Sequence, residues 1–342
     1  MNVNKRPMKQ MTESRLYLAE IVGEESLQGH RMQAGAILDL MDILAGRIAF
    51  RHSGSSVVTL SFDRVDLTFP ILHQDLVRLE GQLVSVGNSS MIVHVQVYRQ
   101  DLLSREFVPA QGSFVTMVAV DARHRPNRNI PGLLYETPEE EKIRDEVERR
   151  KEATRLWMQV QEDVDGDEDL RIADIEEQSN REKQEYLNPD QTRVEVRRQF
   201  MMRHENKNGA IFGGDILLWM DRVATYTARR FTRNRNMVTI AMNRIFFKEP
   251  IFTTDLVDMT ARVVYVRTNT LEVEIDVRLH RLGGEVVPSH SGYFTVLNYD
   301  EAGFKRPIVT GLKLDDADQD GLRSYRKAQE RHRLWRESAA AS

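Results

Sequence analysis

Two acidic residues occupy the same position in two similar apolar segments of this sequence. Asp42 ends the segment AGAILDLMD (residues 34–42), and Asp221 ends the segment GGDILLWMD (residues 213–221). Each follows a glycine by about two helical turns. A carboxylate in an apolar helix is costly unless it is paired or hydrogen-bonded, and such groups collect at functional sites. The pattern indicates either a catalytic carboxylate or an acid held in an interface ion pair.

The loop before the second segment carries amides and glycines. Residues 204–214 read HENKNGAIFGG, so Asn206 comes shortly before Gly213 and Gly214. The side-chain amide of an asparagine can donate to an acyl carbonyl or orient a water, although loop asparagines commonly serve as turn residues. Backbone N–H groups at a helix start are unpaired and can stabilise an oxyanion. The glycines can equally serve only to turn the loop into the helix, and the first copy retains only Gly35.

These segments belong to a long internal repeat. Residues 57–77 and 237–257 share Val, Thr, Arg, Pro-Ile and Asp-Leu-Val in register, and residues 113–120 match residues 292–299 more loosely. The order and the spacing, close to 180 residues, make chance unlikely. Because this period is far longer than a solenoid unit, we interpret it as a duplicated domain.

Each copy has the same expected order of elements: a short strand, a glycine-containing loop, a helix and several strands. The helices, about 35–52 and 214–231, have little polar face and should be buried. The Val-, Ile-, Thr- and Phe-rich strands are predicted at 15–20, 57–69, 76–86, 91–100 and 112–120, and at 193–199, 237–247, 256–266, 270–279 and 291–299. One buried helix followed by an antiparallel meander predicts an α+β fold with two tandem hot-dog domains, each a sheet wrapped around a long buried helix.

A charged stretch separates the copies and another follows them. Thr137, Pro138 and Glu140 have the types and order of a helix start. The helix that follows can be a solvated linker or a partner helix, and a second charged helix is expected near residues 320–341. We therefore predict a first domain at 12–132, a helical linker at 133–190, a second domain at 191–312 and a helical tail at 313–342.

Composition narrows the functional classes. The net charge of −4 gives no basic footprint for nucleic acid, and the absence of cysteine excludes disulfides, thiolate metal sites and a Cys nucleophile. No apolar stretch is long enough for a spanning helix, and we expect a cytoplasmic protein. The histidines show no metal spacing, the aspartate-rich stretches do not complete a calcium loop, and no phosphate-binding or Ser-nucleophile motif appears. We expect no metal and no cofactor.

The full set of motifs resembles the acyl-CoA thioesterase branch of the hot-dog superfamily. The motifs are Asn206-x-x-Gly-x-Ile-Phe-Gly-Gly before the helix with Asp221, Val-Thr at 58–59 and 238–239, the Pro-Ile-x-x-x-Asp-x-Val segments at 70–77 and 250–257, and Val-Gly-Asn-Ser-Ser-Met at 86–91. The tandem arrangement is similar to that of animal-type double-hot-dog acyl-CoA hydrolases. The resemblance covers most of the chain outside the linker and the tails.

The resemblance implies a site where two hot-dog units meet. One unit supplies the loop Asn and the other the helix Asp, while Gly213, Gly214 and Gly35 are the expected oxyanion or substrate-binding positions. The second copy has both Asn206 and Asp221, but the Asn position of the first copy falls on Leu27, next to Gln28. We therefore predict that Asn206 works with Asp42 and that the site of Asp221 is degenerate.

The leading hypothesis is the hydrolysis of acyl-CoA to a carboxylic acid and CoA, with CoA entering only as part of the substrate. The resemblance also implies a homo-oligomer, such as a trimer of double hot-dogs, and a role in fatty-acid metabolism. The alternative is a non-catalytic acyl-CoA-binding or sensor protein. A third interpretation, a hot-dog hydratase, would need a His here, and His204 lies before the loop rather than on the helix. The basic candidates for contacts to the phosphates of CoA are Arg64, Arg244, Lys248, Arg267 and residues 123–125.

Overall fold

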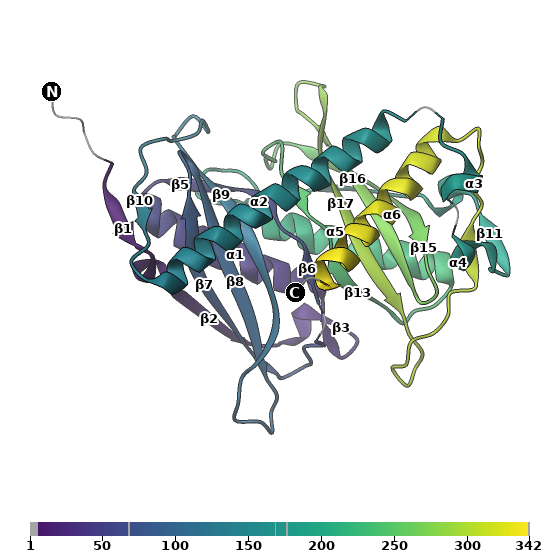
Figure 1. Cartoon of the computed structure of the whole chain (residues 1–342), viewed down its shortest axis with the longest axis horizontal. Helices are drawn as coiled ribbons and strands as arrows, with labels where there is room; N and C mark the ends of the chain where they lie inside the picture. The colour runs from purple at the N-terminus through teal and green to yellow at the C-terminus, as the bar shows by residue number, and fades with distance from the viewer. Residues whose placement is uncertain (1–5, 68, 168, 176, 341–342) are drawn as a thin grey trace.

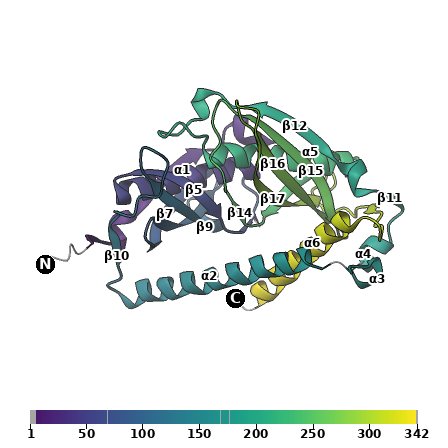
Figure 2. The same ribbon diagram turned by 90° about the horizontal axis from the view of Figure 1, so that it is seen from above.

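A computed structural model describes residues 6–67, 69–167, 169–175 and 177–340. It contains two six-stranded sheets side by side, each crossed by one long helix (Figure 1). These buried helices are α1 (Ala34–Ser53) and α5 (Gly213–Thr232). The sheets lie between α1 and α5 on one side and two further helices on the other (Figure 2). The predicted pair of hot-dog units is confirmed.

The first sheet is antiparallel and covers α1. Its strands, in spatial order, are β14 (Ile245–Phe246), β5 (Ser56–Phe62), β9 (Val108–Val120), β8 (Ser90–Gln100), β7 (Leu76–Val86) and β2 (Leu16–Ile21). Alternate residues of β7 and β8 are buried, as expected for strands with one face on a core. The apolar side chains of α1 fill that core.

The second sheet repeats this arrangement over α5. Its strands are β12 (Val194–Gln199), β15 (Leu256–Val266), β16 (Thr270–His280), β17 (Val286–Asn298), β13 (Met237–Met242) and β6 (Val65–Asp66). Within the described residues, three small two-stranded ladders complete the strands: β1 (Met8–Gln10) with β10 (Gly132–Leu134), β11 (Glu185–Leu187) with β18 (Thr310–Leu312), and β3 (Leu27–Gln28) with β4 (Arg31–Met32).

The two units exchange their shortest strands. We predicted single strands at 57–69 and 237–247, and this was wrong: each breaks after about six residues, and its second part crosses to the other sheet. β6 pairs with β13, and β14 pairs with β5. The backbone N–H of Leu67 donates to the carbonyl of Ile240, and that of Phe247 to the carbonyl of Leu60. The exchange joins the two sheets along one boundary.

Two charged helices cover the outer faces of the sheets. α2 (Pro138–Asp165) begins with the predicted capping box, in which Thr137 and Glu140 exchange hydrogen bonds. It lies across the first sheet with Val147 buried, and so it is more than a solvated linker (Figure 2). α6 (Gln319–Ala340) lies across the second sheet and contacts α2. The remaining short helices are α3 (Ile172–Ile175), α4 (Gln178–Arg181) and the 3-10 turns at Met11–Ser14, Glu24–Ser26, Pro189–Thr192 and Met202–His204.

Candidate active site

The two buried helices touch near their N-terminal ends through glycines. A Cβ atom on Gly35 would lie 2.5 Å from the Cα of Leu218, and one on Gly214 would lie 2.7 Å from the Cα of Asp39. Real side chains do not approach a backbone so closely, and any residue larger than glycine would push the helices apart. The reciprocal contacts show that the first turns of α1 and α5 pack antiparallel. These glycines therefore set the distance between the two halves of the site.

Each helix carboxylate binds the start of the opposite helix. The Gly214 N–H donates to Asp42 Oδ2 at 2.8 Å, and the Gly35 N–H donates to Asp221 Oδ2 at 2.9 Å. The positive end of a helix stabilises a carboxylate placed in this way. The amides of Gly35 and Gly214 thus hold carboxylates in this structure, whereas we had expected them to face a substrate oxygen.

A threonine from a neighbouring strand donates a further hydrogen bond to each carboxylate. Thr59 on β5 donates to Asp42 at 2.7 Å, and Thr239 on β13 donates to Asp221 at 2.5 Å. Both carboxylates are almost fully buried. Burial raises the pKa of Asp42 and of Asp221, while the hydrogen bonds from threonine and glycine act in the opposite direction. A buried carboxylate with a raised pKa is a better proton acceptor than an exposed one.

The loop of residues 204–212 holds the amide of Asn206 in one orientation. Asn206 Oδ1 accepts hydrogen bonds from the N–H groups of Asn208, at 2.8 Å, and Ala210, at 3.3 Å. Gly209 turns the loop with a φ of 75°, a conformation that favours glycine. The loop thus binds the amide through its oxygen. The Nδ2 group makes no hydrogen bond to any of the described residues. It can donate a hydrogen bond to a ligand.

A cavity of about 690 Å³ brings Asn206 and Asp42 together across the boundary between the units. Gly213 also lines it, whereas Gly35, Gly214 and Asp221 do not. Its walls come from α1, the first turn of α5, β5, β9, the 203–212 loop and the segment 247–251 that follows β14. This size suits an organic ligand, since such pockets commonly have about 300–1,000 Å³. The structure therefore places Asn206 and Asp42 on the walls of one cavity, while their pairing in catalysis stays a prediction.

The pseudo-equivalent site around Asp221 has a different composition. Leu27 and Gln28 lie on the small hairpin β3–β4, and Gln28 Nε2 donates to the carbonyl of Met237 at 3.3 Å. The Nε2 group of Gln28 thus donates to the protein, whereas the Nδ2 group of Asn206 has no partner among the described residues. Asp221 is 1% exposed and is held by Thr239 and Gly35. This asymmetry agrees with a structural role for Asp221.

Three further carboxyl groups, those of Asp39, Asp215 and Glu249, line the cavity and were missed in the sequence. Burial, together with the nearby charges of Asp215 and Asp42, raises the pKa of Asp39 to about 7. Burial also raises the pKa of Asp215, while His204 and two arginines lower it. Asp39 is three residues before Asp42, so helical spacing could have placed it on the same face. Asp215 comes from the other helix, and no local pattern indicates that it meets Asp39.

Basic residues surround the same cavity. Of the candidates from the sequence, His124 and Lys248 line it, together with Arg47, Arg203 and Lys207, which the sequence did not single out. Of the other candidates, Arg123 does not line the cavity, and the rest pair elsewhere: Arg64 with Asp66, Arg125 with Asp121, Arg244 with Asp63 and Arg267 with His332. The cavity therefore combines the buried carboxylate of Asp42 with a lining that carries both basic and acidic side chains.

In the described part of the chain, no cluster of three or more metal-ligating His, Asp or Glu side chains is found. Nor is any helix of the described residues long and apolar enough to cross a membrane.

In a comparison with known proteins, both repeats match the same family model. The model of the thioesterase superfamily matches residues 32–104 and 208–284, one region in each hot-dog unit. Acyl-coenzyme A thioesterase 11 of Mus musculus is 27% identical over 309 residues, which cover 89% of this chain and 50% of that protein. The acyl-CoA thioester hydrolase YkhA of Bacillus subtilis is 39% identical over 106 residues, which cover 31% of this chain and 61% of that protein.

A solved structure shares the tandem architecture. The crystal structure of a candidate oleoyl thioesterase from Lactobacillus plantarum aligns over 84% of this chain and 97% of its own length, with a TM-score of 0.55 at 6% identity. Fold and site define a double-hot-dog protein, and each of its two units contains a region that matches the thioesterase-superfamily model. It spans about half the length of the curated full-length relatives that it matches.

Proposed function

We propose that this protein hydrolyses acyl-CoA thioesters in the cavity between its two hot-dog units. The observation that carries this proposal is the position of Asn206, with a free Nδ2 group, and the buried Asp42 on the walls of one cavity. Relatives named acyl-CoA thioesterase support the substrate class.

The reaction needs a group that activates water. Asp42 is held by Thr59 and Gly214 in one orientation, and its raised pKa suits it to accept a proton. The water oxygen then bonds to the thioester carbon, the C–S bond breaks, and the CoA sulfur leaves as a thiolate that takes up a proton. Direct attack by Asp42 on the carbonyl carbon, with later hydrolysis of the anhydride, uses the same geometry.

The carbonyl oxygen gains negative charge during this attack. Asn206 Nδ2 is the proposed donor to that oxygen, because the loop already occupies Oδ1. The backbone N–H of Gly213, which lines the cavity, is the proposed second donor to this oxygen. One oriented donor of this kind is typically worth about 10²–10³ in kcat. No metal or further cofactor is required by this scheme, and CoA enters as part of the substrate.

The basic lining suits the phosphates of CoA. Arg47, Lys207 and Lys248 lie around the cavity, and the ammonium group of Lys207 is 4.8 Å from the centroid of the Phe50 ring. Charge-assisted hydrogen bonds to phosphate are stronger than neutral ones. We therefore propose these residues as contacts for the nucleotide end of the substrate.

The non-catalytic alternative makes a different prediction in the same assay. Release of free thiol is followed over a panel of acyl-CoA chain lengths, with binding of the same compounds measured in parallel. Turnover that is lost in Asn206→Ala supports the enzyme, whereas tight binding without turnover supports a sensor. The hydratase interpretation loses its candidate residue, because both ring nitrogens of His204 are hydrogen-bonded, to Met201 and Arg203, and His204 does not line the cavity.

We further propose that the chain forms a homo-oligomer, such as a trimer of double-hot-dog chains. Light scattering of the purified protein tests this directly, and a mass equal to that of one chain, 39.6 kDa, would contradict it.

A further inference from the structure

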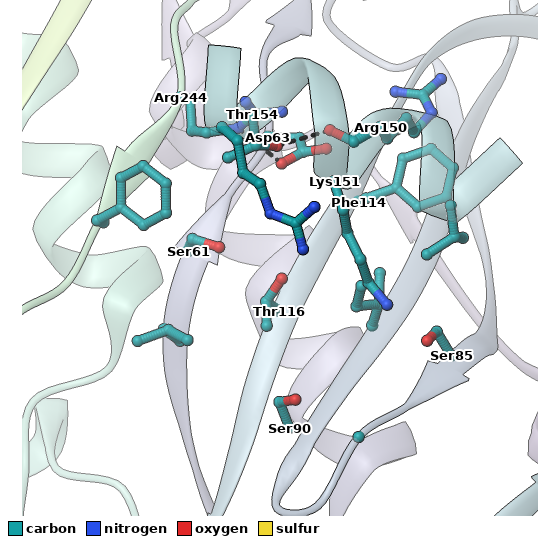
Figure 3. Close-up of a pocket in the computed structure, with 16 residues that line it drawn as sticks. Ser61, Asp63, Ser85, Ser90, Phe114, Thr116, Arg150, Lys151, Thr154 and Arg244 are labelled. Carbon is teal, nitrogen blue, oxygen red and sulfur yellow. Dashed lines mark hydrogen bonds and ion pairs between the residues drawn. The ribbon is translucent and has the colours of Figure 1, made fainter. Parts of the chain in front are cut away.

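A second cavity, of about 320 Å³, lies on the outer side of the first sheet, beneath α2 (Figure 3). Leu60 on β5 lines both cavities, but the two open on opposite sides of this strand. A β-bulge between Thr59 and Ser61 produces this arrangement. It lets Thr59 face α1 and Asp42, while Ser61, two residues later, faces α2. The outer cavity is therefore separate from the proposed active site.

The floor of the outer cavity is one row of side chains across five strands. The register places Phe246, Ser61, Thr116, Ile92 and Ser85 directly beside one another. The hydroxyl groups of Ser61 and Thr116 make no hydrogen bond within the described part of the chain. They can therefore donate to a ligand. Apolar surface from Phe246 and Ile92 lies on either side of them.

The roof of the outer cavity is one face of α2. Val147, Arg150, Lys151 and Thr154 have the spacing of a single helix face and all line the cavity. Lys151 reaches down from the helix to a point between Thr116 and Ser85 (Figure 3).

The charge around the outer cavity is unbalanced. Its lining includes four basic side chains, Arg150, Lys151, Arg155 and Arg244, but a single carboxylate, Asp63, which pairs with Arg244 at 2.9 Å. The acidic partners of the α2 cations are exposed residues of the helix itself, Glu146, Glu148 and Glu152. Such surface pairs are typically worth only about 0–1 kcal/mol and exchange readily with another anion. The cavity thus favours an anionic ligand.

The second unit shows what occupies the corresponding position there. The equivalent row of its sheet is Asp66, Ala241, Thr295, Glu272 and Tyr265. Glu272 therefore takes the place that Ile92 has in the first unit. α6 covers this row as α2 covers the first, contacting β15 where α2 contacts β7.

In that second unit the helix cation has a carboxylate partner within the chain. Arg331 of α6 is 2% exposed, and its Nε donates to Glu272 at 2.9 Å. A buried cation is costly without such a partner. The first unit presents cations from its helix over the same place, but Ile92 offers them no carboxylate.

We propose that the outer cavity binds a small monocarboxylate, whose carboxylate group takes the position that the Glu272 carboxylate has in the second unit. Lys151 and Arg150 pair with it, and Ser61 and Thr116 donate hydrogen bonds to it. Its short apolar chain packs against Leu60, Phe114 and Phe246. The free acids released by the proposed reaction belong to this chemical class, but the binding site does not depend on that reaction.

Isothermal titration with hexanoate, using the full chain, tests this proposal. Replacing Arg150 and Lys151 together by glutamine should weaken hexanoate binding at least ten-fold. The matched control replaces Lys142 and Arg149 by glutamine, which makes the same change in charge on the same helix outside the cavity, and should leave the affinity unchanged. Binding that is absent in the wild type, or equally weakened in both double variants, would overturn the proposal.

Three further measurements identify the cavity in which the ligand binds and its chemical class. Ile92→Glu supplies an internal carboxylate, as Glu272 does, and should abolish hexanoate binding in a protein whose circular dichroism shows it folded; binding at the wild-type level would contradict the proposal. Asn206→Ala should leave the affinity unchanged, and weakening there but not in the Arg150/Lys151 variant would move the ligand to the other cavity. Inorganic phosphate that binds as tightly as hexanoate would overturn the carboxylate class.

Discussion

Replacing Thr59 by valine should shift the pH dependence of hydrolysis in a known direction. The substitution keeps the shape of the side chain and removes the hydroxyl that donates to Asp42 at 2.7 Å. That hydrogen bond lowers the pKa of Asp42 against the effect of burial, and its loss must therefore raise this pKa further. Because the proposed mechanism uses the carboxylate form of Asp42, activity should be lost as the pH falls through this pKa.

The size of the shift follows from the strength of a hydrogen bond to a charged group. A hydrogen bond to a charged group contributes about 1.5–3 kcal/mol. One pKa unit corresponds to about 1.4 kcal/mol. The acid limb of the kcat profile should therefore move to higher pH by about one to two units in Thr59→Val, while Thr59→Ser, which keeps a hydroxyl, should restore it.

The assay is the initial rate of thiol release against pH, with Thr239→Val as the matched control. Thr239 makes the same contact to Asp221, which lies outside the cavity. This control should leave the acid limb in place. An unmoved limb in Thr59→Val, or an equal shift in Thr239→Val, would refute the assignment of Asp42 as the titrating group.

Two other substitutions test the helix contact and the acidic lining. Gly35→Ala should lower the free energy of unfolding by about 1–3 kcal/mol in urea denaturation, because its Cβ would meet the backbone of Leu218. Gly46→Ala, whose Cβ would lie 3.6 Å from the nearest atom, should instead stabilise the helix by about 0.5–1 kcal/mol, and equal effects would contradict the close-approach argument. Asp215→Asn removes a charge that raises the pKa of Asp42, so the acid limb should move to lower pH; an upward shift would contradict this electrostatic account.

Local sequence patterns predicted the helices and the longer strands, but not which strands pair with each other. The apolar runs around Asp42 and Asp221 gave both buried helices, and Thr137, Pro138 and Glu140 gave the start of α2. These features depend on residues close in sequence. The exchange of β6 and β14 between sheets was not predictable, because strands of two residues carry no periodicity and their partners lie about 180 residues away.

In the candidate site, too, local patterns were predictable and contacts between distant segments were not. The repeat, read with the family resemblance, pointed to Asn206 with Asp42, and the structure brings both to one cavity. The approach of Asp215 to Asp39 depends on how two helices cross, which no short motif encodes. The capping of each helix by the Asp of the other also arises only in the folded chain, and it gives Gly35 and Gly214 a packing role that the sequence did not reveal.

The most direct test of the central claim, one active site per chain built from Asn206 and Asp42, compares Asp42→Asn with Asp221→Asn in the thiol-release assay. The two residues have equivalent partners, and both variants keep the shape of the side chain. Asp42→Asn should lower kcat by about 10²–10⁴, the usual contribution of a general base, while Asp221→Asn should retain activity within about ten-fold. Activity that depends on Asp221 and survives in Asp42→Asn would contradict the account.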